Sequence, residues 1–257
     1  AAVVATAGSI LDTNDNNGND VTAANLILKA GTSIAAGTNA LETDVGTIST
    51  LSANGGTFIT EASALTIDRL SIAAKRVGAT GASTTLTALV QEDAVTQETA
   101  ATPLGGATSA LVIQTGGSLT VNAGTTGVSG TPASGISTTG NLLLQASGNS
   151  SDIVLNASVS SSGGDISLSA GHDVLQNVID ANNVGHLTDT AASASVDVLA
   201  GNAITMANGS VTSTNNGAIR FEATAGNITL GQLLAGTSNA AVVATAGSIL
   251  DTNDNNG

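Results

Sequence analysis

The chain lacks cysteine, tryptophan and tyrosine, and has only two phenylalanines, one methionine and two prolines among 257 residues. Without cysteine there can be no disulfide and no thiolate site. With only two large aromatic side chains, the composition argues against a compact core of the usual kind. The apolar residues still make up 41% of the chain, nearly all as Ala, Val, Ile and Leu, which suits a narrow core built from many thin, similar layers.

Basic residues are also scarce, with five Lys and Arg against 19 Asp and Glu and a net charge of −14. Nucleic-acid binding needs basic patches on the phosphates, so nucleic acid is excluded as an expected partner. No apolar run approaches the roughly 20 residues that cross a bilayer, so no membrane insertion is expected. No segment reads as a signal peptide.

One stretch occurs twice: AAVVATAGSILDTNDNNG stands at Ala1–Gly18 and again, without a change, at Ala240–Gly257. The two copies are offset by 239 residues. This predicts that residues 1–239 are one full period of a tandem repeat and that residues 240–257 begin the next identical period. The natural protein is expected to continue at both ends.

A smaller, degenerate repeat runs inside the period, as in NLILKAGTSI (Asn25–Ile34), DISLSAGHDV (Asp165–Val174) and SVDVLAGNAI (Ser195–Ile204). Alternation of apolar and polar residues indicates a strand with one buried face, and the Ala-Gly that follows indicates a corner. Asn25, Ile27 and Lys29 should point outward. The expected core residues are Leu26, Leu28, Ile166, Leu168, Val196, Val198, Ile219 and Phe221.

The alanine that closes each unit recurs at intervals of 23 to 53 residues, and 23 residues suffice for three short strands and three corners. Parallel strands need a crossover, which a returning coil provides without a helix. We therefore predict an all-β parallel β-solenoid. If the 53-residue interval holds two coils, one period has about nine, with a rise of about 43 Å at ~4.8 Å per coil.

Three longer intervals predict excursions from the solenoid, at roughly 72–107, 124–140 and 176–193. The stretch 88–101 could form a short helix. Insertions of this kind usually leave as loops on one side, and that side is often a contact face.

Several of these units resemble filamentous-haemagglutinin-type repeats, which occur in giant bacterial exoproteins exported by two-partner secretion. The similar stretches are GGDISLSAGHDV (Gly163–Val174), GAIRFEATAGNITL (Gly217–Leu230), GNLLLQASG (Gly140–Gly148) and GTISTLSANGGTFITEASALTI (Gly46–Ile67). The resemblance implies a right-handed β-helix, secretion to the bacterial cell surface, and a role as a fibre, adhesin or stalk.

An Asp/Asn-rich stretch resembles calcium loops, because hard oxygen ligands at alternate positions suit Ca²⁺. The candidate ligands are Asp12, Asn14, Asp15 and Asp20. The spacing departs from such a loop, with Asn17 where glycine is needed and Ala23 where a bidentate glutamate is needed. A solenoid corner, where Asn, Asp and Gly cap their own backbone, is therefore favoured, and calcium stays an alternative.

Catalysis is not expected, although some residue types would allow it. His172 beside Asp173, and His186 near Asp189, could form a metal site or an acid–base pair. Glu92, Asp93 and Asp152 are candidate carboxylates for a polysaccharide-acting enzyme by residue type alone. No recognisable nucleophile motif or phosphate-binding glycine loop accompanies them, so no cofactor is expected.

The sequence thus predicts a structural segment of a long extracellular bacterial fibre, with no chemistry of its own. Its partners would be further copies of itself, or the surfaces of other cells in adhesion or a biofilm. The alternatives are a ligand-binding adhesin module that uses its loops and, less favoured, a polysaccharide-acting β-helix enzyme. An ice-binding solenoid would need a regular Thr-x-Thr in every coil, which the sequence does not have.

Overall fold

A computed structural model describes residues 1–13, 18–86, 89–91, 95–97, 110–123, 134–180 and 184–252. All secondary-structure elements in these ranges are β-strands, and these ranges contain no helix. Within the same ranges, no helix is long and apolar enough to cross a membrane.

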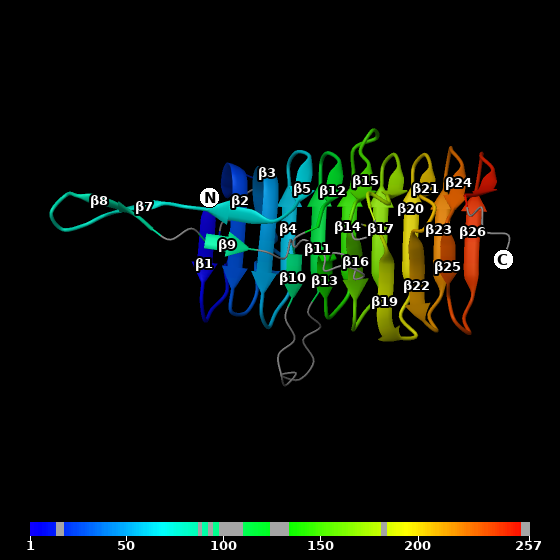
Figure 1. Cartoon of the computed structure of the whole chain (residues 1–257), viewed down its shortest axis with the longest axis horizontal. Coiled ribbons are helices and arrows are strands. Elements are labelled where there is room, and N and C mark those ends of the chain that lie inside the picture. Colours follow the sequence, from blue (N-terminus) through cyan, green and yellow to red (C-terminus); the bar gives the residue numbers. More distant parts are fainter. Residues whose placement is uncertain are drawn as a thin grey trace.

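Most strands lie in three stacks of parallel neighbours, and the chain visits all three before it returns to the first (Figure 1). The first stack holds β4 (Thr57–Glu61), β11 (Leu111–Thr115), β14 (Leu142–Ala146), β17 (Ile166–Ala170), β20 (Val196–Ala200), β23 (Ile219–Ala223) and β26 (Ala240–Ala244). The second holds β5 (Leu65–Ile67), β12 (Leu119–Val121), β15 (Ile153–Leu155), β18 (Val174–Gln176), β21 (Ile204–Met206), β24 (Ile228–Leu230) and β27 (Ile249–Asp251). The third holds β1 (Ala2–Ala5), β10 (Val95–Gln97), β13 (Ser134–Thr138), β16 (Ser158–Ser161), β19 (Leu187–Ala192), β22 (Val211–Asn215) and β25 (Gln232–Leu234).

Two long strands, β2 (Val21–Ala30) and β3 (Leu41–Ser52), run through all three stacks. β4 and β5 pair with β11 and β12, and from β10 to β24 each strand pairs with the one three places later, as β14 does with β17 over five residues in register. This all-β, parallel arrangement is consistent with the predicted β-solenoid.

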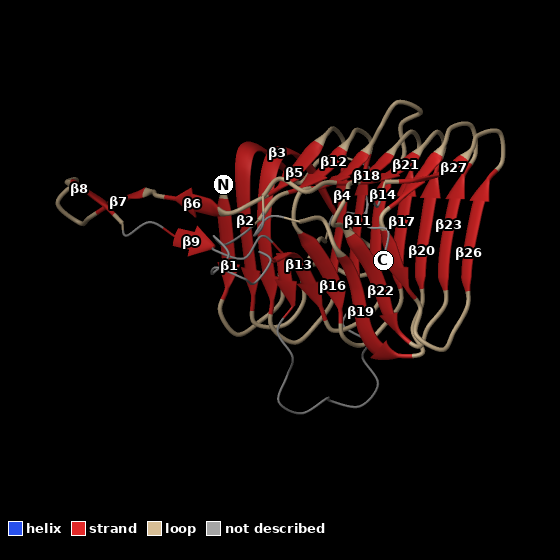
Figure 2. Ribbon diagram, turned by 45° about the vertical axis from the view of Figure 1, so that its right-hand side comes forward, coloured by secondary structure: helices blue, strands red, loops and turns tan. Residues whose placement is uncertain are grey.

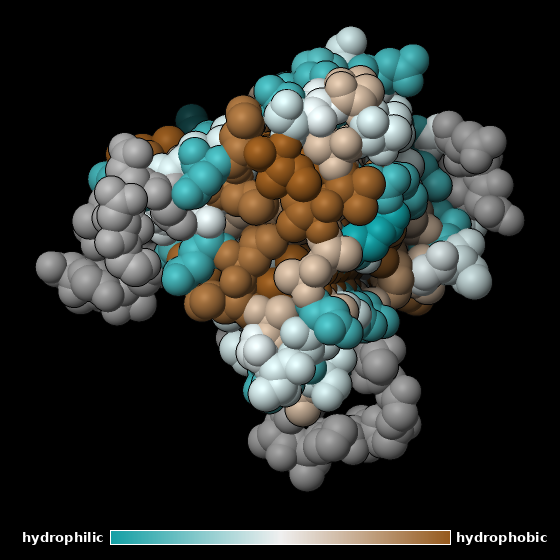
Figure 3. All heavy atoms as spheres, turned by 90° about the vertical axis from the view of Figure 1, so that its right-hand side faces the viewer, coloured by the Kyte–Doolittle hydropathy of each residue, from teal (hydrophilic) through white to brown (hydrophobic). Residues whose placement is uncertain are grey.

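Inward-facing aliphatic ladders form the core. The eight residues predicted to be core are each at most 1% exposed. In the first stack, for example, Leu144, Leu168, Val198 and Phe221 lie side by side in successive coils. Each such side chain contributes on the order of 1.5–3 kcal/mol by its burial. At the end of the stacks that carries β26 and β27, apolar side chains reach the surface (Figure 3).

The Ala-Gly corners require glycine because successive corners pack backbone against backbone. A Cβ added at Gly201 would lie 2.1 Å from the carbonyl oxygen of Gly171, and one at Gly171 would lie 2.2 Å from that of Gly148. No side chain fits such a gap, which explains why the unit repeats this glycine.

The coil count predicted from the sequence is too high. β4 pairs directly with β11 through five residues in register, so the 53-residue interval holds one coil and not two. From β1 to β26 the chain makes eight coils and advances by one further stack, rather than nine coils.

The excursions are shorter than predicted, because strands of the third stack lie inside each predicted range. β10 lies between β3 and β13 in the stack, so 72–107 is not one insertion. β13 and β19 likewise shorten the ranges 124–140 and 176–193. In the described part of 88–101, where the sequence would have allowed a short helix, the structure has the strands β9 (Leu89–Gln91) and β10.

The excursion after β5 covers a surface that was expected to be open. Its strand β6 (Leu70–Ile72) pairs antiparallel with β9 and contacts β2 and β3. Ile27, predicted to point into solvent, is accordingly 0% exposed, and Leu51 is 8% exposed. Beyond this cover, β7 (Lys75–Val77) and β8 (Ser83–Thr85) form a hairpin that projects away from the stacks (Figure 2).

Candidate functional site

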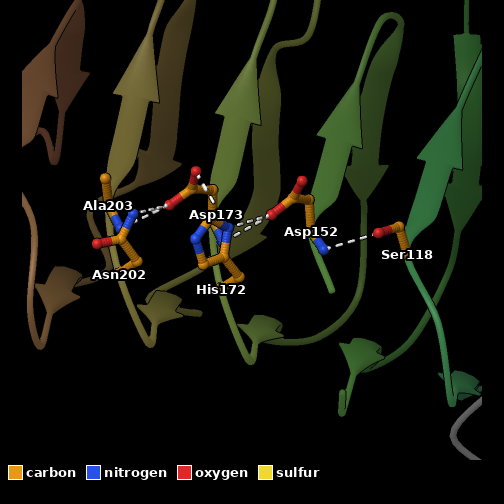
Figure 4. A network of polar contacts seen from close by, with 6 residues as sticks. All are labelled: Ser118, Asp152, His172, Asp173, Asn202 and Ala203. Atoms are coloured by element: carbon orange, nitrogen blue, oxygen red, sulfur yellow. Dashed lines mark hydrogen bonds and ion pairs between the residues drawn. The ribbon is translucent and has the colours of Figure 1, made fainter. Parts of the chain in front are cut away.

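The corner between the first and second stacks carries a ladder of polar side chains (Figure 4). Just before several of the second-stack strands stands a residue whose side chain accepts a hydrogen bond from the backbone N–H one coil further on. The Asp152 N–H donates to Ser118 Oγ (3.0 Å), and the Asp173 N–H donates to Asp152 Oδ1 (3.0 Å). The Ala203 N–H donates to Asp173 Oδ1 (2.8 Å). The ladder therefore caps the corners.

His172 lies within this ladder between two carboxylates. Its Nδ1 is 2.8 Å from Asp152 Oδ1 and 3.3 Å from Asp173 Oδ2. The hydrogen bond to Asp152 raises the pKa of His172, and the negative charges of Asp173 and Asp152 raise it further. The imidazole is 41% exposed, so protonation adds an exposed cation that bridges neighbouring coils.

The sequence had singled out Asp152, His172 and Asp173 by residue type, and the fold brings them together. One ligand atom from each lies within 4.8 Å of the others, a spacing that could hold a divalent ion or pass a proton. The carboxylates are already engaged, however. Asp152 Oδ1 accepts from His172 and from a backbone N–H, and Asp173 Oδ1 accepts from Asn202 Nδ2 (2.8 Å) as well as a backbone N–H. Corner capping accounts for both.

The same capping pattern recurs at the corner that leads from the third stack to the first. The Asp165 N–H donates to Asn141 Oδ1 (3.0 Å), and the Ser195 N–H donates to Asp165 Oδ1 (2.8 Å). The ladder around His172 is therefore one case of a general rule for these corners.

The calcium candidates are brought together only in part. Asp12 and Asp20 lie with Glu42, one carboxylate oxygen of each within 4.8 Å of the others. Asn14 and Asp15 lie outside the described residues. Desolvation raises the pKa of Glu42, and the charges of Asp12 and Asp20 raise it further. Three carboxylate oxygens are ligands that Ca²⁺ accepts, but Asp20 also caps a corner, because its Oδ2 accepts the Glu42 N–H at 3.3 Å.

His186 and Asp189, paired in the sequence reading, have separate backbone partners. The Val211 N–H donates to His186 Nδ1 (3.0 Å), and burial lowers the pKa of this histidine. Asp189 is 2% exposed, its Oδ1 accepts the Ala191 N–H (2.8 Å), and burial raises its pKa to about 6. The other candidate carboxylates, Glu92 and Asp93, lie outside the residues whose side chains are described.

Sequence reasoning missed one buried carboxylate, Glu61, which is 1% exposed. It accepts from Thr43 Oγ1 (2.7 Å), from the Val45 N–H (3.0 Å) and from the Ser63 N–H (3.0 Å), so it fastens β4 to the coil before it. The sequence did contain a signal for this buried carboxylate: Glu61 occupies a position at which the next two coils have Thr115 and Ala146.

An asparagine ladder was missed as well. The side chain of Asn122 donates to Asp68 (3.1 Å), that of Asn156 to Asn122 (2.9 Å), and that of Asn177 to Asn156 (2.9 Å). These residues directly follow the second-stack strands, and a cavity of about 280 Å³ lies beside them. Amides that stack in register satisfy one another, so the ladder stabilises this side of the stack.

Comparison of the chain with family models, with curated proteins and with solved structures found no match in any of the three. Geometry therefore defines the class: an all-β protein of stacked parallel strands, in which polar corner residues bond to the next coil.

Proposed function

We propose that the chain is a segment of a long extracellular fibre on a bacterial cell surface, built as a right-handed parallel β-helix. Its work is mechanical: it spans distance and presents surfaces for adhesion, cell–cell contact or biofilm formation. We propose no catalysis and no cofactor. Calcium at the Asp12–Asp20–Glu42 corner is an alternative that a metal titration would test.

The observation that carries this proposal is the unbroken parallel stacking from β1 to β27, in which each coil packs chiefly on the coils next to it. Stability in such an array is a sum of nearest-neighbour terms, so length can be added without redesign. The polar residues at the corners support the same interpretation, because they bond to the next coil.

The ends of the stacks favour association with further copies. On the face with β26 and β27, Val243 is 45% exposed, Ile249 is 51% and Leu250 is 45% (Figure 3). A parallel strand edge beside apolar side chains is a template for strand addition. The partner we propose is therefore the same chain, stacked end to end.

A second candidate function, a ligand-binding adhesin module, is favoured by the β7–β8 hairpin. It projects from the stacks and exposes Lys75, Arg76 and Val77 (Figure 2). Two of the five basic residues thus lie on an arm that stands off an acidic body. Such an arm suits contact with an acidic surface, including the side of a neighbouring fibre in a lateral bundle.

Electron microscopy of the native assembly tests the main proposal. A continuous fibre with an axial spacing of ~4.8 Å and a longer repeat of about 40 Å is expected, from eight coils and one strand per period. Discrete particles without that spacing would refute the fibre. Deletion of the β7–β8 hairpin tests the second candidate function. If the protein without the hairpin bundles and adheres like the intact protein, the hairpin is not a contact.

A further inference from the structure

The 18-residue segment that occurs twice lies in two different stacks. In the first copy, β1 lies in the third stack, against Ile27–Ala30 of β2. In the second copy, the same residues form β26 in the first stack, against β23. The identical sequence is therefore shifted by one stack.

Its shape is unchanged by the shift. In both copies a strand is followed by a corner and then by an isoleucine that enters the next stack. Ile10 enters the first stack beside Ile34, whereas Ile249 enters the second beside Ile228. The strand–corner–strand unit thus fits either position.

The inward and outward faces of the strand are also the same. Val3 lies beside Leu28, and its counterpart Val242 lies beside Phe221; both neighbours are 0% exposed. The next residue points outward in both copies, with Lys29 as the neighbour in the first and Glu222 in the second. On the inward face, Leu28 in the first copy and Phe221 in the second therefore continue the same apolar ladder.

The two copies make backbone bonds on opposite edges. The backbone of β1 and of the corner after it bonds to the coil that follows. Ala5 O accepts from Gly31 N (2.8 Å), Gly8 O accepts from Thr32 N (3.1 Å), and Ile10 N donates to Ser33 O (2.9 Å).

The second copy bonds to the coil that precedes it. Thr245 N donates to Ala223 O (2.9 Å), and Ser248 O accepts from Ile228 N (2.9 Å). These are positions 6 and 9 of the repeated segment, whereas the first copy uses positions 5, 8 and 10. Because no atom is used twice among these bonds, one segment can make both sets at once.

We infer that a single copy of this segment joins consecutive periods of the fibre, bonded to β23 of the period before and to β2 of the period after. This rests on the proposed tandem fibre. The third stack of each period then continues the first stack of the period before it. Since one period contains eight coils and one further strand, each period is turned by one third of a turn about the fibre axis.

The rotation has a consequence for the surface. Every period carries a projecting β7–β8 hairpin, and successive hairpins point in three directions in turn instead of forming one ridge. A fibre of this kind presents its basic arm around its whole circumference. The occupant of the exposed β26 edge is the following period of the same sequence, whose Leu28 packs on Val242 as it does on Val3 in the first copy.

The direct test uses a two-period chain, residues 1–239 followed by residues 1–257, in which the junction segment is shared. An Ala82→Cys substitution in each hairpin provides unique sites for gold labels, since the natural chain has no cysteine. In electron micrographs of single rods, the two labels should differ in azimuth by one third of a turn. Labels on the same side of a straight rod would overturn the rotation.

Engineered disulfides test the shared contact. In the two-period chain, Val243→Cys should oxidise with Glu222→Cys of the first period and, in a separate variant, with Lys29→Cys of the second. Parallel neighbours lie ~4.8 Å apart, within the range for a disulfide. Two matched pairs in the 257-residue chain, Val4→Cys with Lys29→Cys and Glu222→Cys with Val243→Cys, are neighbours already and serve as controls. Controls that oxidise while either junction pair does not would overturn the inference.

The microscopy also separates the two proposals. Two rods joined by a flexible gap would refute the continuous fibre itself. One continuous rod with both labels on the same side would leave the fibre standing and refute only the rotated junction.

Discussion

Replacing Asp189 with asparagine should stabilise the protein at neutral pH, and this gain should be lost in acid. The carboxyl group is 2% exposed, and its Oδ2 is buried with no hydrogen-bond partner among the described residues. Burial, and less so the charge of Asp165, raises its pKa from 3.8 to about 6. An asparagine side chain at this position would keep the shape and carry no charge.

The sign and the size of this effect on stability follow from the linkage between proton binding and folding. A carboxyl group whose folded pKa is raised contributes its full stability below about pH 4, and this contribution is lost as the pH rises through about 6. The difference between 3.8 and about 6 corresponds to at most about 3 kcal/mol at neutral pH. The buried amide of the variant has its own desolvation cost, so a net gain of about 1–2 kcal/mol at pH 8 is expected.

Urea unfolding followed by far-UV circular dichroism, at pH 4 and at pH 8, measures this difference between wild type and variant. Asp44→Asn is the matched control, because Asp44 is partly exposed and meets the Ser63 hydroxyl at 3.1 Å. If Asp189→Asn changes stability equally at both pH values, the argument from burial of a charge is wrong.

Three further substitutions test the fold. Leu168→Asp should prevent a stable coil, because it buries an unpaired charge, whereas Ser169→Asp on the outer face should cost under about 0.5 kcal/mol; proteolysis of both variants measures this. Gly201→Ala should cost about 1–3 kcal/mol in urea, because the new Cβ meets a carbonyl oxygen at 2.1 Å, while Gly8→Ala meets nothing within 4 Å and should be neutral. Glu61→Ala should lower the thermal midpoint by leaving buried donors unpaired, at about 1–3 kcal/mol; a midpoint equal to that of wild type would contradict the role given to this carboxylate.

Local patterns predicted the core correctly. Alternation of apolar and polar residues depends only on the pleat of a single strand, so it identified residues such as Ile166 and Val198 without knowledge of their neighbours. Ile27 shows where this reasoning stops. Its outward direction was read correctly, but its burial depends on β6, which lies more than 40 residues further along the chain.

The candidate sites were predictable only within one corner. The Asp152–His172–Asp173 ladder joins residues from two coils, and Glu42 meets Asp12 and Asp20 only because β2 and β3 pair in register. Residue type alone suggested metal or acid–base chemistry at these positions. Because neighbouring coils pair in register, carboxylates such as Asp20, Asp152 and Asp173 instead accept a hydrogen bond from a backbone N–H of the next coil.

The one further stack by which a period exceeds eight coils has a cause that also explains the junction. A strand, an Ala-Gly corner and a second strand form a unit whose geometry does not depend on the stack in which it lies. The two copies of AAVVATAGSIL occupy different stacks with the same inward residues and the same corner. Two similar units in the sequence can therefore lie one stack apart, so a count of similar units is not a count of coils. The direction in which a fibre of such units faces is set by the number of stack positions that the chain visits in one period, counted modulo three. Gain or loss of a single strand–corner unit would therefore turn everything beyond it by a third of a turn while the core ladders stay apolar.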